Sequence, residues 1–586
     1  MSYTAPLDDI AFVLRHVVGL PELDLGLGIE EAEAVLAEAG RFAAEVLAPL
    51  NRVGDRQPAV LENGTVRSSP GFAEAYRLFV ENGWNAVSAD VEHGGNGLPD
   101  MLAAALTELW NGANMAFALC PLLTQSAAET LAHYGDARQK RLYLPRLVSG
   151  EWTGPMCLTE PQAGSDLGAI RCAARASEDG QHRLKGQKIF ITWGDHDMAE
   201  NLVHMVLARL EGGPPGSKGL SLFLVPKRMV REDGALGSAN AVRCVGLEHK
   251  LGLHGSPTAL MQYGEDAGAY AELVGAPHRG IEAMFSMMNR ARLGIGLQGV
   301  GLAERAYQQA RAYALARVQG RVVGSSDEAL PILHHPDVRR MLMVSKAKLE
   351  AARAMALEAA AMSDRARLGE ASAAARLDLL IPMVKATATD LAVEIASTAI
   401  QIHGGAGFIE ETGIAQAYRD ARVTPIYEGT NGIQAGDLVT RKLLRDGGAA
   451  MAALIRDINR SYGALAEETG EELRAIAPHL RLGRAALDRA GQHLIATEAS
   501  EPRRVLAASY PYLRLASMVV GGWLMARVGL AAQAELAAGR GNERFLRAKL
   551  VTARCFAEHV LVEAETLERI IRGGGASLLA LEPEQF

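Results

Sequence analysis

The feature of this sequence that most restricts its fold is a block of strand-like residues set between long helix-like stretches. Apolar residues recur at steps of three and four over residues 30–47 and 72–80, and again after Gly280. Between residues 156 and 280, short β-branched or apolar runs alternate with turn residues. This double change of pattern predicts a mainly α protein with an inserted β domain.

Within the middle block, the clearest strand candidates are residues 187–192, 202–208, 220–225 and 258–263. Ser177–Gly180 and Gly212–Pro215 have the composition of hairpin connections. Later, the Ala/Leu-rich runs 302–318, 338–362 and 377–401 predict an antiparallel bundle. We therefore expect four domains: a helical N-terminal domain (1–155), a compact β middle domain (156–280), a helical bundle (281–445) and an extra C-terminal helical domain (446–586).

Composition narrows the classes of function. The 586 residues are 49% hydrophobic but only 5% aromatic, so the apolar material consists mostly of helix-forming side chains. A net charge of −8 and a pI near 6.1 argue against a nucleic-acid-binding surface. Residues 441–586 hold 20 basic and 17 acidic residues, and this net charge of +3 is too weak for a DNA-binding tail.

The five cysteines, Cys120, Cys157, Cys172, Cys244 and Cys555, show neither C-x-x-C spacing nor disulfide density. Asp8 and Asp9 stand where a secretory signal needs a basic start. The longest uncharged apolar run, residues 515–526, is too short to span a bilayer and reads as a buried helix. We expect a cytoplasmic protein with no membrane span and no metal site.

Residues 401–434 carry the strongest candidate for catalysis. Gly404, Gly405 and Gly407 let the backbone approach a ligand closely, and Pro425 disfavours helix before the turn at Glu428-Gly429. Thr430 or Asn431 can cap a helix that starts near Ile433. Glu428 is then either a shielded carboxylate with a raised pKa, suited to a general base, or an ordinary first-turn glutamate that complements a helix dipole.

A second candidate stretch, Leu158-Thr-Glu-Pro-Gln-Ala-Gly-Ser-Asp166, stands where the helical pattern gives way to the β pattern. Thr159 and Ser165 offer hydroxyls, and Gly164 frees backbone donors that can face a polar heterocycle. An ordinary Ser/Asp turn is the alternative reading. Thr192 is either a similar hydroxyl or a threonine at a strand end.

Taken together, the motifs of this sequence resemble the acyl-CoA dehydrogenase family. In order, they are Gly83-Trp84, Gly94-Gly-x-Gly-Leu-Pro99, Leu158-Thr-Glu-Pro-x-x-Gly-Ser-Asp166, Ile191-Thr192, Arg292, Gln401-x-x-Gly-Gly-x-Gly407 and Tyr427-Glu-Gly-Thr430. The resemblance covers residues 40–440 and implies that the β middle domain is β-barrel-like. The opening residues, Glu248–Pro257 and the long C-terminus are similar to the larger bacterial branch, which includes 3-methylmercaptopropionyl-CoA dehydrogenases.

The resemblance implies an FAD enzyme that converts an acyl-CoA to the trans-2-enoyl-CoA and passes electrons to an electron-transfer flavoprotein. By position, Glu428 removes the α-proton while a hydride leaves the β-carbon for flavin N5. The missing strand-GxGxxG-helix unit fits, because this family does not hold FAD in a Rossmann fold. Implied flavin contacts are Leu158, Thr159, Phe190, Thr192 and Thr430, and implied substrate contacts are Ser165, Asn289, Arg292 and Gly429.

Arg317, Gln401, Gly404 and Gly405 match family positions that contact an FAD held by the neighbouring subunit. In relatives with such a C-terminal extension, the extra helices occupy the face used for tetramer formation, so the resemblance implies a homodimer. Phe190 stands where the family usually has Trp. Arg317 lacks the family's following Phe-Gly, and residues 321–336 form a long polar connection. Two rivals share the fold: an acyl-CoA oxidase that uses oxygen, and a DNA-associated relative.

Overall fold

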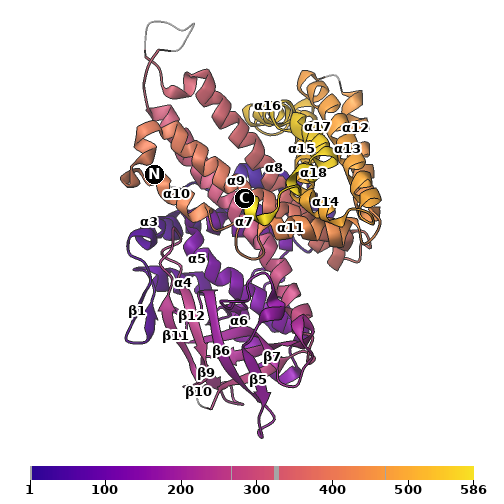
Figure 1. Ribbon diagram of the computed structural model, residues 1–586. Helices are drawn as coiled ribbons and strands as arrows, with labels where there is room; N and C mark the ends of the chain where they lie inside the picture. The colour runs from indigo at the N-terminus through magenta and orange to yellow at the C-terminus, as the bar shows by residue number, and fades with distance from the viewer. Residues whose placement is uncertain (1–2, 266, 322–328, 469) are drawn as a thin grey trace.

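The computed structural model describes residues 3–265, 267–321, 329–468 and 470–586. A helical N-terminal part leads into a β domain, then a central helical bundle, then a further set of C-terminal helices (Figure 1). The predicted fold class, mainly α with an inserted β domain, is confirmed. The polar connection expected over residues 321–336 lies partly outside the described residues.

The N-terminal part is built around one long helix, α5. Its helices are α1 (Leu7–His16), α2 (Ile29–Phe42), α3 (Ala48–Arg56), α4 (Phe72–Glu81), α5 (Asp100–Tyr134) and α6 (Ala137–Ser149). A short hairpin, β1 (Val60–Glu62) and β2 (Thr65–Arg67), projects from it. The helix predicted over residues 30–47 is present, with its last turn, Ala43–Leu47, wound as a π-helix that leads into α3.

The β domain contains the strands that the alternating pattern predicts. They are β3 (Trp152–Thr153), β4 (Met156–Cys157), β5 (Ala173–Ala176), β6 (His182–Thr192), β7 (Asn201–Leu210), β8 (Leu220–Pro226), β9 (Arg228–Val230), β10 (Leu236–Ala239), β11 (Val242–Leu247), β12 (Thr258–Tyr263) and β13 (Ala269–Val274). Both predicted hairpins are present, since β5 pairs with β6 and β7 with β8 in antiparallel register. Because β5 also pairs with β7, and β13 joins β6 to β8, five strands close into a ring.

Three long helices form the bundle: α7 (Gly280–Ala316), α8 (Pro336–Arg367) and α9 (Ala373–His403). Two shorter helices, α10 (Ile414–Ala421) and α11 (Asn431–Asp437), follow. Glycines let α7 lie unusually close to its neighbours. A methyl group on Gly299 would come 2.4 Å from the Ala388 backbone of α9, and one on Gly301 would come 2.6 Å from the Gly112 backbone of α5. Around Gly299 and Gly301, α7 is therefore packed tightly between α5 and α9.

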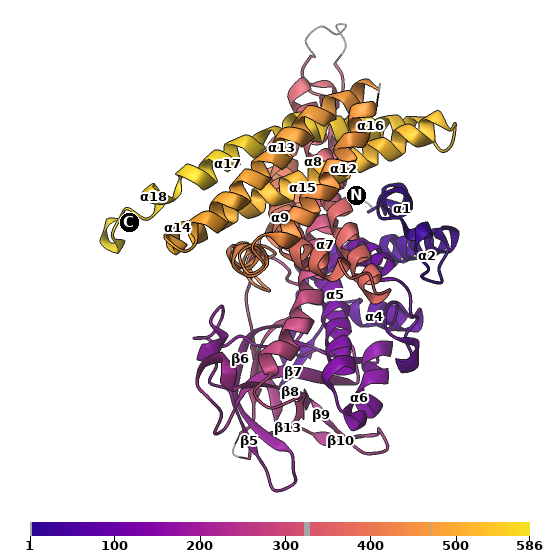
Figure 2. The same cartoon turned by 90° about the vertical axis from the view of Figure 1, so that its right-hand side faces the viewer.

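The C-terminal helices lie against the side of the bundle, at the end of the molecule away from the β domain (Figure 2). They are α12 (Ala449–Glu467), α13 (Glu471–Thr497), α14 (Pro502–Ala507), α15 (Ser509–Ala537), α16 (Glu543–His559), α17 (Ala564–Gly573) and α18 (Gly575–Leu578). Among the described helices, α15 alone is long and apolar enough to cross a membrane, and 78% of its apolar window is buried inside the protein. The run predicted as a buried helix is thus the middle of a longer buried helix.

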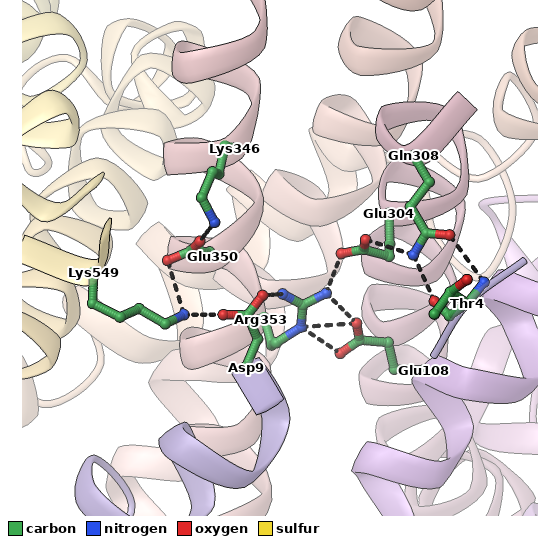
Figure 3. A network of polar contacts seen from close by, with 9 residues as sticks. All are labelled: Thr4, Asp9, Glu108, Glu304, Gln308, Lys346, Glu350, Arg353 and Lys549. Atoms are coloured by element: carbon green, nitrogen blue, oxygen red, sulfur yellow. Dashed lines mark hydrogen bonds and ion pairs between the residues drawn. The ribbon is translucent and has the colours of Figure 1, made fainter. Parts of the chain in front are cut away.

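A buried cluster of charges joins the helices at their centre. Arg353 of α8 is 1% exposed and lies between Glu108 of α5 and Glu304 of α7 (Figure 3). Its guanidinium donates to Glu108 Oε1 over 2.6 Å and to Glu304 Oε2 over 2.5 Å. Burial raises the pKa of Glu108, although Arg353 opposes this shift. Charged groups this deep are stable only when paired, so the three helices depend on one another here.

The same cluster attaches both ends of the chain to α8. Lys549 of α16 forms ion pairs with Asp9 of α1 and, over 3.1 Å, with Glu350 of α8 (Figure 3). Lys346, one turn before Glu350, pairs with it as well. Burial opposes ionisation of Asp9, but Lys549 and Arg353 outweigh it and lower the pKa of Asp9 to about 2. The first helix and the C-terminal helices are therefore integral parts of the fold.

Candidate active site

Glu428 lies on a strained turn between α10 and α11. Its φ is +55°, a left-handed conformation that costs a non-glycine residue about 1–3 kcal/mol, and Gly429 follows with φ +85°. The turn ends where the Thr430 hydroxyl accepts a hydrogen bond from the Ile433 amide over 3.2 Å. The predicted cap is thus confirmed, although α11 begins two residues earlier than predicted, at Asn431. Such strain persists only where the surroundings fix the backbone.

The carboxylate of Glu428 lines a pocket between the β domain and the bundle. The pocket has about 490 Å³ of space not filled by protein atoms, part of it open to solvent. Its walls come from α5, the β4 region, the end of β6, α7 and the turn itself: Leu119, Leu122, Leu123, Met156, Leu158, Thr159, Phe190, Ile191, Thr192, Ala291, Ile295, Tyr427 and Glu428. The structure therefore brings five candidates from three distant stretches into one site: Glu428, Leu158, Thr159, Phe190 and Thr192.

Glu428 has the electrostatic character of a base that works near neutral pH. Burial raises its pKa to about 7, against the opposing pull of Arg292 and Lys385. Arg292 of α7 is 5% exposed, and its Nε lacks a hydrogen-bond partner within the described residues. One of its terminal nitrogens donates to Asn289 Oδ1 over 3.3 Å. Because the pKa of Glu428 is about 7, its ionised and neutral forms are close in free energy near that pH.

Lys385 of α9 is the residue of this site that sequence reasoning missed. It is fully buried, and its Nζ donates to the Gly429 carbonyl and to Asn431 Oδ1, each over 2.9 Å. Burial lowers its pKa to about 7, while Glu428 acts in the opposite direction. A signal was available, because Lys385 falls in helical register with the buried Ile381 and Ala388. Lysine is almost never buried in that way without a partner.

A second buried lysine, Lys188, holds in place the stretch that carries Leu158 and Thr159. Lys188 of β6 donates to the Leu158 carbonyl over 2.8 Å and pairs with Glu160 over 2.8 Å. The carboxylate of Glu160 also accepts the backbone N–H groups of Arg171 and Cys172. The stretch that carries Leu158 and Thr159 is thus held by an internal ion pair, which accounts for the glutamate in the Leu-Thr-Glu-Pro motif.

The other candidates lie outside this pocket. Ser165 is exposed on the loop after β4, and Thr430 is exposed while it caps α11. Arg317 follows the last residue of α7, 25 residues beyond Arg292, which is about 38 Å of helix at 1.5 Å per residue. Gln401 lies in the last turn of α9, and Gly404 and Gly405 follow it.

Arg317, Gln401, Gly404 and Gly405 share an exposed surface at one end of the bundle. The rings of Tyr313 and His403 stack there, with centroids 4.3 Å apart, and so join the ends of α7 and α9. A methyl group added to Gly404 or Gly405 would meet no atom within 4 Å. These residues are free to face another molecule but do not reach Glu428 of their own chain.

Four family models match consecutive parts of the chain. They are the acyl-CoA dehydrogenase N-terminal domain over residues 29–151, middle domain over 155–264 and C-terminal domain over 278–443, and a domain described as acetyl-CoA dehydrogenase C-terminal like over 450–582. The chain belongs to the acyl-CoA dehydrogenase family. Among relatives, 3-methylmercaptopropionyl-CoA dehydrogenase of Ruegeria pomeroyi is 47% identical over 99% of both chains.

Two further comparisons show how far the similarity extends. A broad-specificity linear acyl-CoA dehydrogenase of Mycobacterium tuberculosis is 34% identical over the whole of both chains. The structure of Caenorhabditis elegans ACDH-11 in complex with C11-CoA matches with a TM-score of 0.79 at 21% identity, covering 96% of this chain and 92% of that one. At that identity the match supports the fold alone, including the C-terminal helices.

The pocket suits the planar, polar ring that an acyl-CoA dehydrogenase binds. Thr159 and Thr192 present part-buried hydroxyls to it. Phe190, with φ +59°, leaves 58% of its surface exposed at the pocket instead of packing into the core. The Phe190 ring and the two threonine hydroxyls suit a heterocycle that has apolar faces and a polar edge.

Proposed function

We propose that this acyl-CoA dehydrogenase uses FAD, and that Glu428 removes the α-proton of an acyl-CoA thioester to form the trans-2-enoyl-CoA. The observation that carries the proposal is the pocket that joins Glu428 to Leu158, Thr159, Phe190 and Thr192. Bound FAD supplies the acceptor for the hydride that leaves the β-carbon. Every other requirement of the reaction falls on the protein.

The first requirement is a base matched to a weak carbon acid. An α-proton about ten pK units less acidic than the base would cost about 14 kcal/mol to remove. Burial reduces this mismatch because it raises the pKa of Glu428 to about 7. The amide N–H of Glu428 makes no hydrogen bond within the described residues, so it can donate to the thioester carbonyl as negative charge develops there.

The acyl group enters an apolar part of the pocket. Leu119, Leu122 and Leu123 of α5 and Ile295 of α7 line it. Beyond them the Tyr427 hydroxyl donates to Gln298 Oε1 over 2.5 Å. We propose a short acyl group, and the 47% identical relative named for a methylmercapto substrate supports a chain that can contain a thioether.

Anaerobic mixing with a panel of acyl-CoA thioesters tests this function. We expect butyryl-CoA and 3-methylmercaptopropionyl-CoA to bleach the flavin absorbance fastest, with octanoyl-CoA slower and palmitoyl-CoA slowest. Failure of the whole panel to bleach the flavin would refute the dehydrogenase function. Rapid peroxide formation in air without an added acceptor would favour an oxidase instead.

We also propose a homodimer that works in the cytoplasm and passes its electrons to an electron-transfer flavoprotein. Support for the dimer comes from the exposed end of the bundle, where Gly404 and Gly405 stand beside Phe408, a side chain that is 88% exposed. A structure titled for the electron-transferring flavoprotein of Acidaminococcus fermentans matches with a TM-score of 0.59 at 26% identity. We expect sedimentation to give twice the chain mass; a tetramer would contradict the dimer.

A further inference from the structure

A chain of hydrogen bonds runs from the C-terminal helices to the catalytic turn. It begins at Tyr510, in the first turn of α15, whose hydroxyl donates to Asp390 Oδ2 on α9. The other oxygen, Asp390 Oδ1, accepts from Asn431 Nδ2 over 2.8 Å. The C-terminal domain therefore contacts, through a single carboxylate, the residue that begins α11.

The chain continues from Asn431 to the backbone beside Glu428. Asn431 is 5% exposed, and its Oδ1 accepts from Lys385 Nζ over 2.9 Å. The same ammonium donates to the Gly429 carbonyl over 2.9 Å. Because Asn431 Nδ2 also donates to the Thr389 hydroxyl and the Ala386 carbonyl, its side chain is fixed from both sides.

Two properties make this chain relevant to the carboxylate of Glu428. The turn holds Glu428 at φ +55°, a conformation that relaxes unless neighbouring groups keep it in place. Lys385 holds the turn through the Gly429 carbonyl, and Gln434 Nε2 also donates to the Glu428 and Gly429 carbonyls, over 3.4 Å and 3.3 Å. A buried ammonium depends on its acceptors for stability. A shift of Asn431 would therefore move both the Lys385 ammonium and the peptide after Glu428.

We propose that Tyr510 is a positioning residue, through which the C-terminal domain holds the Glu428 turn by way of Asp390, Asn431 and Lys385. The catalytic meaning of this inference rests on the proposed role of Glu428 as the base. The C-terminal helices thus contribute to the rate of proton abstraction as well as to the core. Without the Tyr510 hydroxyl, Asp390 is free to reorient and holds Asn431 less firmly in its present geometry.

Tyr510→Phe, with Tyr512→Phe as a matched control, tests the proposal. Tyr512 is on the same helix, and its buried hydroxyl has no hydrogen-bond partner within the described residues. In flavin-loaded Tyr510→Phe we expect the rate of flavin reduction at saturating acyl-CoA to fall about three- to tenfold, the size of effect expected from one hydrogen bond. Half-saturation should stay within about twofold, and Tyr512→Phe should match the wild type. A wild-type rate in Tyr510→Phe, or an equal fall in both variants, would overturn the proposal.

A double-mutant comparison separates this chain from a simple docking contact. Asp390→Ala breaks the chain at its middle, so adding Tyr510→Phe to it should cause no further loss of rate. Additive losses would mean that Tyr510 acts by another route. They would overturn the proposal.

Amide hydrogen exchange of residues 424–434 supplies a readout that needs no turnover. We expect faster exchange there in Tyr510→Phe than in the wild type or in Tyr512→Phe. Unchanged exchange would refute the coupling even if acyl-CoA reduces the flavin. If no acyl-CoA reduced the flavin but exchange rose as expected, the proposed function would fail while the coupling stood.

Discussion

Glu428→Gln should leave a folded, yellow protein whose flavin acyl-CoA bleaches about 10²- to 10⁴-fold more slowly than in the wild type. The amide has nearly the shape of the carboxylate and can keep its place on the turn, but it cannot accept the α-proton. Flavin binding should survive, because the expected contacts of the ring come from Thr159, Thr192 and Phe190. Anaerobic stopped-flow absorbance at saturating substrate measures the effect.

An exposed glutamate nearby in the sequence provides the control. Glu411→Gln makes the same chemical change outside the pocket, and its bleaching rate should equal that of the wild type. In the wild type and the control, the rate should rise with pH through about 7, because Glu428 acts as a base only when ionised and burial raises its pKa to about that value. Bleaching of Glu428→Gln at the wild-type rate would remove Glu428 from the mechanism.

Arg353→Met should lower the free energy of unfolding by about 3–5 kcal/mol, the range found when one partner of a buried ion pair is removed. The substitution preserves much of the side-chain volume but leaves Glu108, which is fully buried, facing Glu304 without a counter-charge. It also removes an attraction that lowers the pKa of Asp9 on α1. The urea concentration at the midpoint of unfolding, with flavin bound, measures the change.

A surface arginine gives the matched comparison. Arg460 pairs with Asp457 within one helix and is 77% exposed, so Arg460→Met should cost at most about 1 kcal/mol. Equal unfolding midpoints for the two variants would contradict the view that the buried cluster joins α5, α7, α8 and both ends of the chain.

Local sequence patterns predicted most of the secondary structure. Short β-branched or apolar runs bounded by turn residues identified β6 and β12 at residues 187–192 and 258–263. Thr430 could be recognised as a cap because its hydroxyl acts on an amide only three residues away. The closed ring of strands could not be derived in the same way, since the pairing of β5 with β7 joins segments that local periodicity does not relate.

Which residues of α5 line the pocket could not be predicted from local sequence patterns. Among the apolar residues of α5, Leu122 lines the pocket, while Met115 and Phe117 are buried in the core. Leu119, Leu122 and Leu123 of α5 line the pocket. Which part of a buried helix meets a pocket depends on the elements packed against it, and local periodicity does not give that packing.

The contacts of Lys385 were hidden for a related reason. A lone lysine in an apolar run indicates burial, but its acceptors, the Gly429 carbonyl and Asn431, are more than forty residues away. The resemblance to a family supplied Glu428 and the pocket hydroxyls through their motifs. It said nothing of Tyr510, because the motifs end before the C-terminal helices begin.

The central claim is that Glu428 takes the α-proton of a bound thioester, and isotope exchange tests it without any oxidation. An acyl-CoA analogue with sulfur in place of the β-carbon can lose its α-proton but has no β-hydride to give. In D₂O we expect the wild type and Glu411→Gln to exchange the α-hydrogens of this analogue, while Glu428→Gln leaves them in place. Exchange by Glu428→Gln at the wild-type rate would show that another group is the base.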